Sequence, residues 1–78
     1  MTKHEKQILK EFKESPKFKS RTAKALAEAL EAGAKISEIG LLWNYIQEKY
    51  KQVPISENKL RNKFRFYWCL LNDKFNEK

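Results

Sequence analysis

Arginine and asparagine recur between residues 58 and 65, in the stretch NKLRNKFR, and their side chains suit the recognition of nucleic acids. In the DNA major groove, the guanidinium of arginine forks onto guanine and the amide of asparagine onto adenine. Lysines beside them suit phosphate contacts, which contribute affinity without sequence information. The candidate nucleic-acid-binding residues are Lys49, Lys51, Asn58, Lys59, Arg61, Asn62, Lys63 and Arg65. Whether they act together depends on the elements that carry them.

Residues 57–74 are expected to form one long helix, because Pro54 ends the preceding segment and Ser56 supplies an N-cap. At about 100° per residue, an apolar stripe about 100° wide gathers on this helix. Its members are Leu60, Phe64, Tyr67, Trp68, Leu71 and Phe75. Beside it lies a strip without carboxylates, made of Asn58, Arg61, Asn62, Arg65, Cys69 and Asn72. We expect the aromatic residues to be core, and the strip to be either a DNA-reading surface or a solvated outer face.

Helical periodicity also organises the rest of the chain, which has two glycines, two prolines and no long apolar/polar alternation. Further helices are expected over residues 4–14, 21–33 and 37–50, with Ser37 beginning the last of them. Ser20 or Thr22 can cap the second helix, and Gly33 can end it. The pattern predicts an all-α fold, a small trihelical helix-turn-helix-like domain with an additional N-terminal helix. Residues 1–78 form one domain, with the N-terminal helix and a linker over 1–19 and the core over 20–75.

The chain of 78 residues is basic, with a formal net charge of +7. Residues 1–24 and 49–78 each hold eight cations and three acids, whereas residues 25–48 hold one cation and four acids. This bias favours a polyanionic partner. The hydrophobic residues, 41% of the chain, are too interrupted to predict a membrane span. Because no apolar stretch follows the first lysines, we expect a cytoplasmic protein.

The sequence holds no residue set suited to catalysis, cofactor binding or metal binding. A catalytic site needs a nucleophile with a base, a pair of carboxylates or a cofactor loop. The single histidine, His4, has no evident partner, and the single cysteine, Cys69, is expected to be a half-buried small hydrophobe. One histidine and one cysteine also make no usual set of metal ligands. The chain is therefore not expected to be an enzyme.

Residues 22–68 resemble the small origin-of-transfer-binding accessory proteins of conjugative and mobile elements. The resemblance is carried by an alanine-rich helix closing in ALEAG, then ISEIGLLWNYI, then VPISENKLRNKFRFYW with its serine opening the recognition helix. Gly-Leu-Leu separates Ile39 from Trp43, where the family places the aromatic residue directly after the isoleucine. The resemblance implies a bacterial, plasmid- or phage-borne protein that binds double-stranded DNA. It also implies a role in conjugation, through transfer and relaxosome assembly, or in transcriptional repression, with these residues at the groove: Asn58, Arg61, Asn62 and Arg65.

A protein-interaction module is the alternative, for example a phage-type inhibitor of a host nucleic-acid enzyme. Its basis is the acidic middle segment, because a DNA-binding face would avoid acids that point toward the strip. These acids are Glu28, Glu31, Glu38 and Glu48. Phe66 and Leu70 form an apolar pair outside the core stripe, which the N-terminal helix, a second copy of the chain in a homodimer, or a partner protein would cover. Structured RNA is a third class of partner.

Overall fold

Four α-helices make up the protein in the computed structural model, which describes residues 2–18 and 20–77. They are α1 (Lys3–Glu14), α2 (Arg21–Glu31), α3 (Ile39–Lys49) and α4 (Glu57–Phe75), with a short 3-10 helix, η1 (Pro16–Phe18), after α1. No strand occurs in this part of the chain, so the all-α prediction is confirmed. Residues 1 and 78 of the expected domain, and residue 19 of the expected linker, lie outside the described residues.

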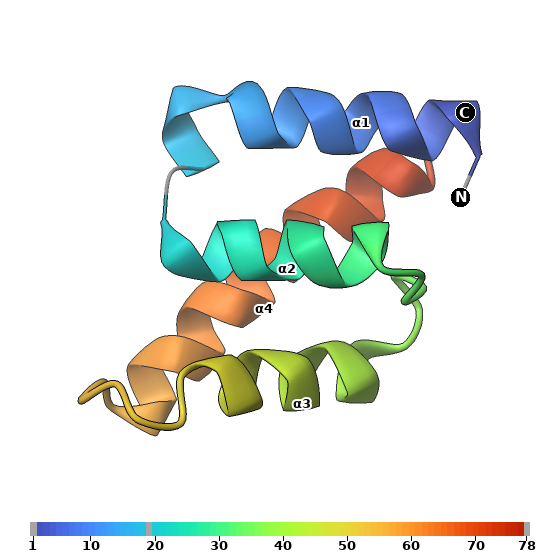
Figure 1. The fold of residues 1–78 in the computed structure, drawn as a ribbon. Helices are drawn as coiled ribbons and strands as arrows, with labels where there is room; N and C mark the ends of the chain where they lie inside the picture. Colours follow the sequence, from blue (N-terminus) through green and yellow to red (C-terminus); the bar gives the residue numbers. More distant parts are fainter. Residues whose placement is uncertain (1, 19, 78) are drawn as a thin grey trace.

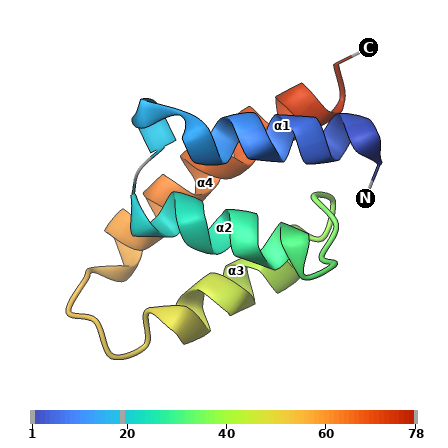
Figure 2. The same cartoon turned by 45° about the horizontal axis from the view of Figure 1, so that its top comes forward.

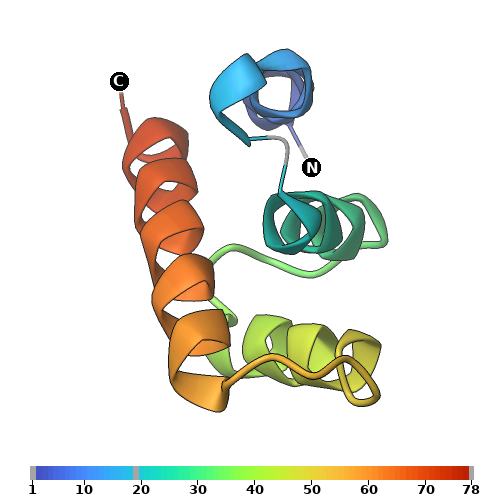
Figure 3. The ribbon, with the colours of Figure 1, turned by 90° about the vertical axis from the view of Figure 1, so that its left-hand side faces the viewer.

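The first three helices lie in one layer, and α4 crosses that layer on one side. Figure 1 shows α1, α2 and α3 stacked with roughly parallel axes, and Figure 2 shows the same stack tilted. In Figure 3 these helices are seen nearly end-on, while α4 runs along all three. Both α2 and α4 contact the other three helices. The long side of α4 that faces the layer therefore packs against it, and the opposite side points away.

The core lies between the stacked helices and where α4 meets them. Its fully buried large side chains come from α2, α3 and α4, and they are Leu26, Leu30, Leu42, Ile46 and Leu71. From α1 come Ile8, Leu9 and Phe12. Burying a side chain of this kind contributes about 1.5–3 kcal/mol to folding. The alanines of α2 are buried as well, and because interaxial distance depends on the side chains at the contact, they allow close helix packing.

Capping residues explain where α2 and α4 begin. The Ser20 hydroxyl accepts a hydrogen bond from the Ala23 N–H at 3.2 Å, which starts α2 as expected. The Ser56 hydroxyl accepts one from the Lys59 N–H at 3.2 Å, which starts α4. Gly33 follows α2 with a positive φ of 115°, a conformation that glycine adopts readily. Of the two caps proposed for α2, the structure therefore has Ser20 rather than Thr22, and the predicted cap Ser56 and glycine stop are confirmed.

The start of α3 differs from the expectation, because the helix begins at Ile39 rather than at Ser37. The preceding turn is closed by Glu38, whose N–H donates to the Lys35 carbonyl at 2.9 Å. The Glu38 carboxylate accepts in return from the Lys35 N–H at 3.0 Å. Glu38 thereby occupies the N-cap position without a side-chain bond to the helix. The prediction that Ser37 begins this helix is therefore wrong. The turn before the helix is closed by Glu38, which bonds to the backbone of Lys35 earlier in the chain.

The apolar stripe of α4 faces the layer, as its helical spacing predicts. Its members are buried or half-buried, and they are Leu60, Phe64, Tyr67, Trp68, Leu71 and Phe75. Phe64 packs against Trp43 of α3 with ring centroids 5.3 Å apart. Tyr67 packs edge-on against Phe18 of η1 at 5.5 Å. These aromatic residues therefore belong to the core rather than to a row of base-stacking platforms.

Trp68 ties α4 to the loop between α2 and α3. Its indole N–H donates to the Ile36 carbonyl at 2.8 Å. A partly buried indole N–H needs such a partner, because leaving it unpaired would cost the energy of its lost hydration. The bond fixes the loop after α2 against α4, and it thereby fixes the position at which α3 begins.

Candidate nucleic-acid interface

One long side of α4 faces away from the other helices, because α1, α2 and α3 all lie on its opposite side (Figure 3). The strip found in the sequence, here called the polar strip, lies beside the apolar stripe of α4 and consists of Asn58, Arg61, Asn62, Arg65, Cys69 and Asn72. All its members are exposed except Asn72, which is half-buried. The expectation of a half-buried Cys69 is wrong, because its side chain is exposed.

Arg61 is held by two contacts at the junction of α4 and α3. Its Nη2 lies 3.5 Å from Oε1 of Glu57, and its guanidinium carbon lies 5.8 Å from the centre of the Trp43 ring. Both side chains of the ion pair are more than half exposed, and such surface pairs contribute about 0–1 kcal/mol. A phosphate or a guanine can therefore displace Glu57 at little cost. No sequence pattern linked Trp43 to this site, because the two residues meet through tertiary packing.

Three further cations on α4 are free to meet a negatively charged partner. Lys59, Lys63 and Arg65 are exposed and form no ion pair with any residue that the structure describes. The Ser56-capped start of α4 adds exposed backbone N–H groups and the positive end of the helix dipole. The first half of α4 thus combines unpaired positive charge with the amide and guanidinium groups of the polar strip.

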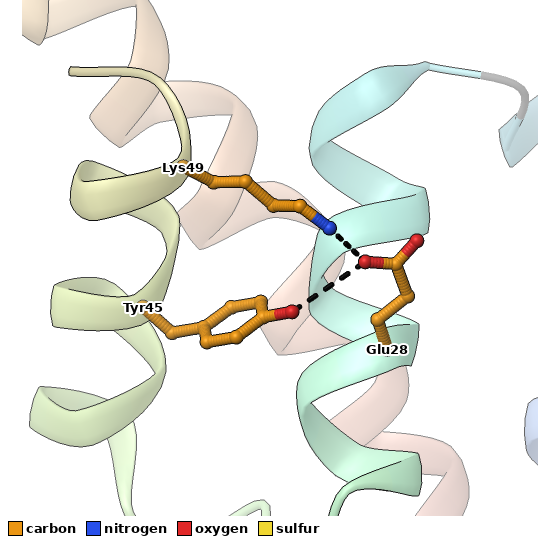
Figure 4. A network of polar contacts seen from close by, with 3 residues as sticks. All are labelled: Glu28, Tyr45 and Lys49. Carbon is orange, nitrogen blue, oxygen red and sulfur yellow. Dashed lines mark hydrogen bonds and ion pairs between the residues drawn. The ribbon is translucent and has the colours of Figure 1, made fainter.

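Lys49, which the sequence placed among the candidate residues, lies away from the polar strip. Its Nζ forms an ion pair with Glu28 of α2, and the Tyr45 hydroxyl donates to the same carboxylate oxygen at 3.5 Å. Figure 4 shows this network between α2 and α3, with α4 passing behind both helices. The hydrogen-bonded ion pair lowers the pKa of Glu28 and raises the pKa of Lys49. Lys49 is therefore engaged on the face of the layer opposite α4.

The acids of the middle segment are engaged within the layer or the turns. Glu31 pairs with Lys13 of α1 at 2.6 Å, and Glu48 lies 3.9 Å from Lys51, which is exposed in the turn before α4. Glu38 is bound to the backbone of the turn before α3. In the described chain, none of these acids forms an ion pair or a hydrogen bond with a residue of α4.

An apolar pair one helical turn apart suggests that one partner covers both residues. In the structure, Phe66 and Leu70 are covered unequally. Leu70 is half-buried beside α1, in a groove that Ile8 and Phe12 also line. Phe66 is 60% exposed, and its ring makes an edge-on contact with Tyr67 at 5.4 Å. The N-terminal helix therefore shields Leu70 and leaves Phe66 open, because Phe66 lies closer to the outward side of α4.

Within the described residues, no three His, Cys, Asp or Glu side chains gather as a metal site requires. No helix there has the length and apolar composition that a bilayer crossing demands. No protein-family model matches the chain, and no curated protein or solved structure shows significant similarity to it. The likeness to origin-of-transfer-binding proteins stays a prediction from the sequence, and the candidate interface rests on the geometry of α4.

Proposed function

We propose that this protein binds double-stranded DNA by laying α4 in the major groove. The observation that carries the proposal is that α4 combines the exposed side chains of the polar strip with exposed cations that form no ion pair in the described chain. An α-helix with its side chains is about 10–12 Å across, and the major groove is about 12 Å wide. Because α4 lies on one side of the domain, it can enter such a groove while the other helices keep their packing.

Base reading and phosphate binding divide between two sets of side chains on α4. The guanidiniums of Arg61 and Arg65 match guanine, and the amides of Asn58 and Asn62 match adenine. The lysines that flank them hold phosphates, which set the position of the helix on the duplex. Lys49 has no part in this interface, because Glu28 engages it on the other face of the layer.

The placement of the acids supports DNA over a protein partner. Glu28, Glu31 and Glu48 each lie beside a lysine, and Glu28 sits on the face of the layer away from α4 (Figure 4). A polyanion approaching the polar strip therefore meets none of these three acids unpaired, and Glu57 at the start of α4 is paired with Arg61. At a transfer origin or an operator, binding of this kind would assemble a nucleoprotein complex or repress transcription.

A salt titration against random duplex DNA tests the proposal. Each phosphate contact releases counterions, so engaging about five phosphates gives a slope near −4.5 for log K against log salt concentration. Mobility-shift titrations at two or more salt concentrations measure this slope. If the parent protein shows no binding at about 50 mM salt, the proposal is wrong.

Matched lysine variants locate the interface in the same assay. Lys59→Ala and Lys63→Ala should each make the slope shallower by about 1, because each removes one phosphate contact. Lys24→Ala is the control, since Lys24 is exposed beside Glu28 and Lys49 on the α2 surface. It should leave the slope unchanged. If all three substitutions change the slope equally, DNA binding depends on the overall positive charge of the protein and not on α4.

A further inference from the structure

Phe66 is the most exposed of the large hydrophobic side chains in the described chain, at 60%. Its ring nevertheless contacts another aromatic ring that packs on the core. It meets Tyr67 at 5.4 Å with the ring planes 72° apart, and Tyr67 in turn packs on Phe18 at 5.5 Å. An aromatic ring held in place against the core but turned to solvent loses little freedom when it binds a partner.

The position of Phe66 places it within the proposed DNA interface. It lies at the midpoint of α4 (Glu57–Phe75), where a straight helix crossing a groove comes nearest to the base edges. It follows Asn62 by four residues, which is one helical turn, and it adjoins Arg65. A base pair next to those read by Asn62 and Arg65 would therefore face the Phe66 ring.

The surroundings of Phe66 indicate a partner that is anionic overall and apolar at one point. Lys59, Lys63 and Arg65 are exposed nearby and unpaired among the described residues, which disfavours a purely apolar protein surface. Duplex DNA offers the required combination. In its major groove, the 5-methyl group of thymine is an apolar contact that a phenylalanine ring can read.

We propose that Phe66 contacts a thymine methyl group and so gives the protein a preference for thymine beside the base pairs read by Asn62 and Arg65. This inference rests on the proposed function. It adds a residue that reads sequence by apolar contact to the arginine and asparagine residues that read by hydrogen bonds.

The test uses a duplex that the parent protein selects from a random pool, and a copy with every thymine replaced by deoxyuridine. The replacement removes the methyl groups and leaves the Watson–Crick hydrogen bonds in place. The parent should bind the deoxyuridine copy about three- to fivefold more weakly, the effect of one buried methyl group. Phe66→Ala should bind both duplexes alike, and Phe66→Leu, which keeps an apolar contact, should retain part of the difference. Leu41→Ala is the matched control, because Leu41 is 58% exposed but lies on α3, and this variant should discriminate as the parent does.

Three outcomes would overturn the inference. They are equal binding of the two duplexes by the parent, full discrimination by Phe66→Ala, and sedimentation showing a parent dimer that Phe66→Ala dissolves. The last would assign the ring to a contact between copies of the chain. A parent that binds no duplex at low salt would overturn the proposed function, and it is distinguished from equal binding by the absence of any complex. Circular dichroism of each variant verifies that it is folded.

Discussion

Arg61 and Arg65 carry the same guanidinium group, yet the structure gives them different starting positions. Arg61 lies against the Trp43 ring and beside Glu57, so its side chain is partly ordered before any partner arrives. Arg65 is exposed and unpaired among the described residues. Binding through Arg61 must first separate it from Glu57, whereas binding through Arg65 has no such contact to break. Arg65 should therefore contribute more than Arg61 to the free energy of binding a base.

Replacing Arg65 with alanine should weaken binding to the preferred duplex by about 1–3 kcal/mol, because the lost contact reads a base. On random DNA the effect should be small. Mobility-shift titrations on the two duplexes, at one salt concentration, measure the difference. Since Arg65 is exposed, the free energy of unfolding should change by no more than about 0.5 kcal/mol.

Lys59→Ala serves as the matched comparison for Arg65→Ala. It should weaken binding to both duplexes alike, because a phosphate contact carries no sequence information. If Arg65→Ala instead matches the parent on both duplexes, the polar strip is a solvated surface and does not read DNA.

At the scale of elements, α1 and η1 are parts of the core rather than additions to it. Ile8, Leu9 and Phe12 are buried, and Phe12 stacks on Phe18 of η1 with centroids 4.5 Å apart. Phe12 also meets Tyr67 of α4 at 6.0 Å. The N-terminal helix therefore holds the second half of α4 in place.

Truncating Phe12 to alanine should destabilise the protein by about 3–5 kcal/mol, because the change removes a buried ring and leaves a cavity among aromatic neighbours. That is a large share of the stability of a domain of this size. Urea denaturation followed by circular dichroism measures the change in the free energy of unfolding.

Lys10→Ala is the control on the same helix, since Lys10 is exposed. Its effect should stay within about 0.5 kcal/mol. A Phe12→Ala protein as stable as the parent would mean that α1 does not pack against α4 in solution.

At the scale of the whole molecule, the sequence predicted the features that depend on residues close together in the chain. The stripe from Leu60 to Phe75 and the cap Ser56 depend on residues a few positions apart and were predicted, and Ser20 was one of the two caps proposed for α2. Spacing also placed Phe66 and Leu70 outside the core stripe, but which of the two α1 covers depends on how the helices pack. The same holds for the engagement of Lys49 of α3 by Glu28 of α2, 21 residues earlier in the chain.

The Trp43 contact with Arg61 and the Trp68 bond to Ile36 give this protein two separate optical reporters. Trp43 lies beside a cation of the proposed interface, so its emission should shift when DNA draws Arg61 away from the ring. Trp68 donates its indole N–H to the Ile36 carbonyl inside the fold, so its emission should change when the protein unfolds. A Trp43→Phe variant should lose the fluorescence response to DNA and keep the response to urea. Trp68→Phe should keep the response to DNA, and it should still respond to urea because Trp43 also packs on the core through Phe64. If both variants respond alike to DNA, binding does not involve Arg61.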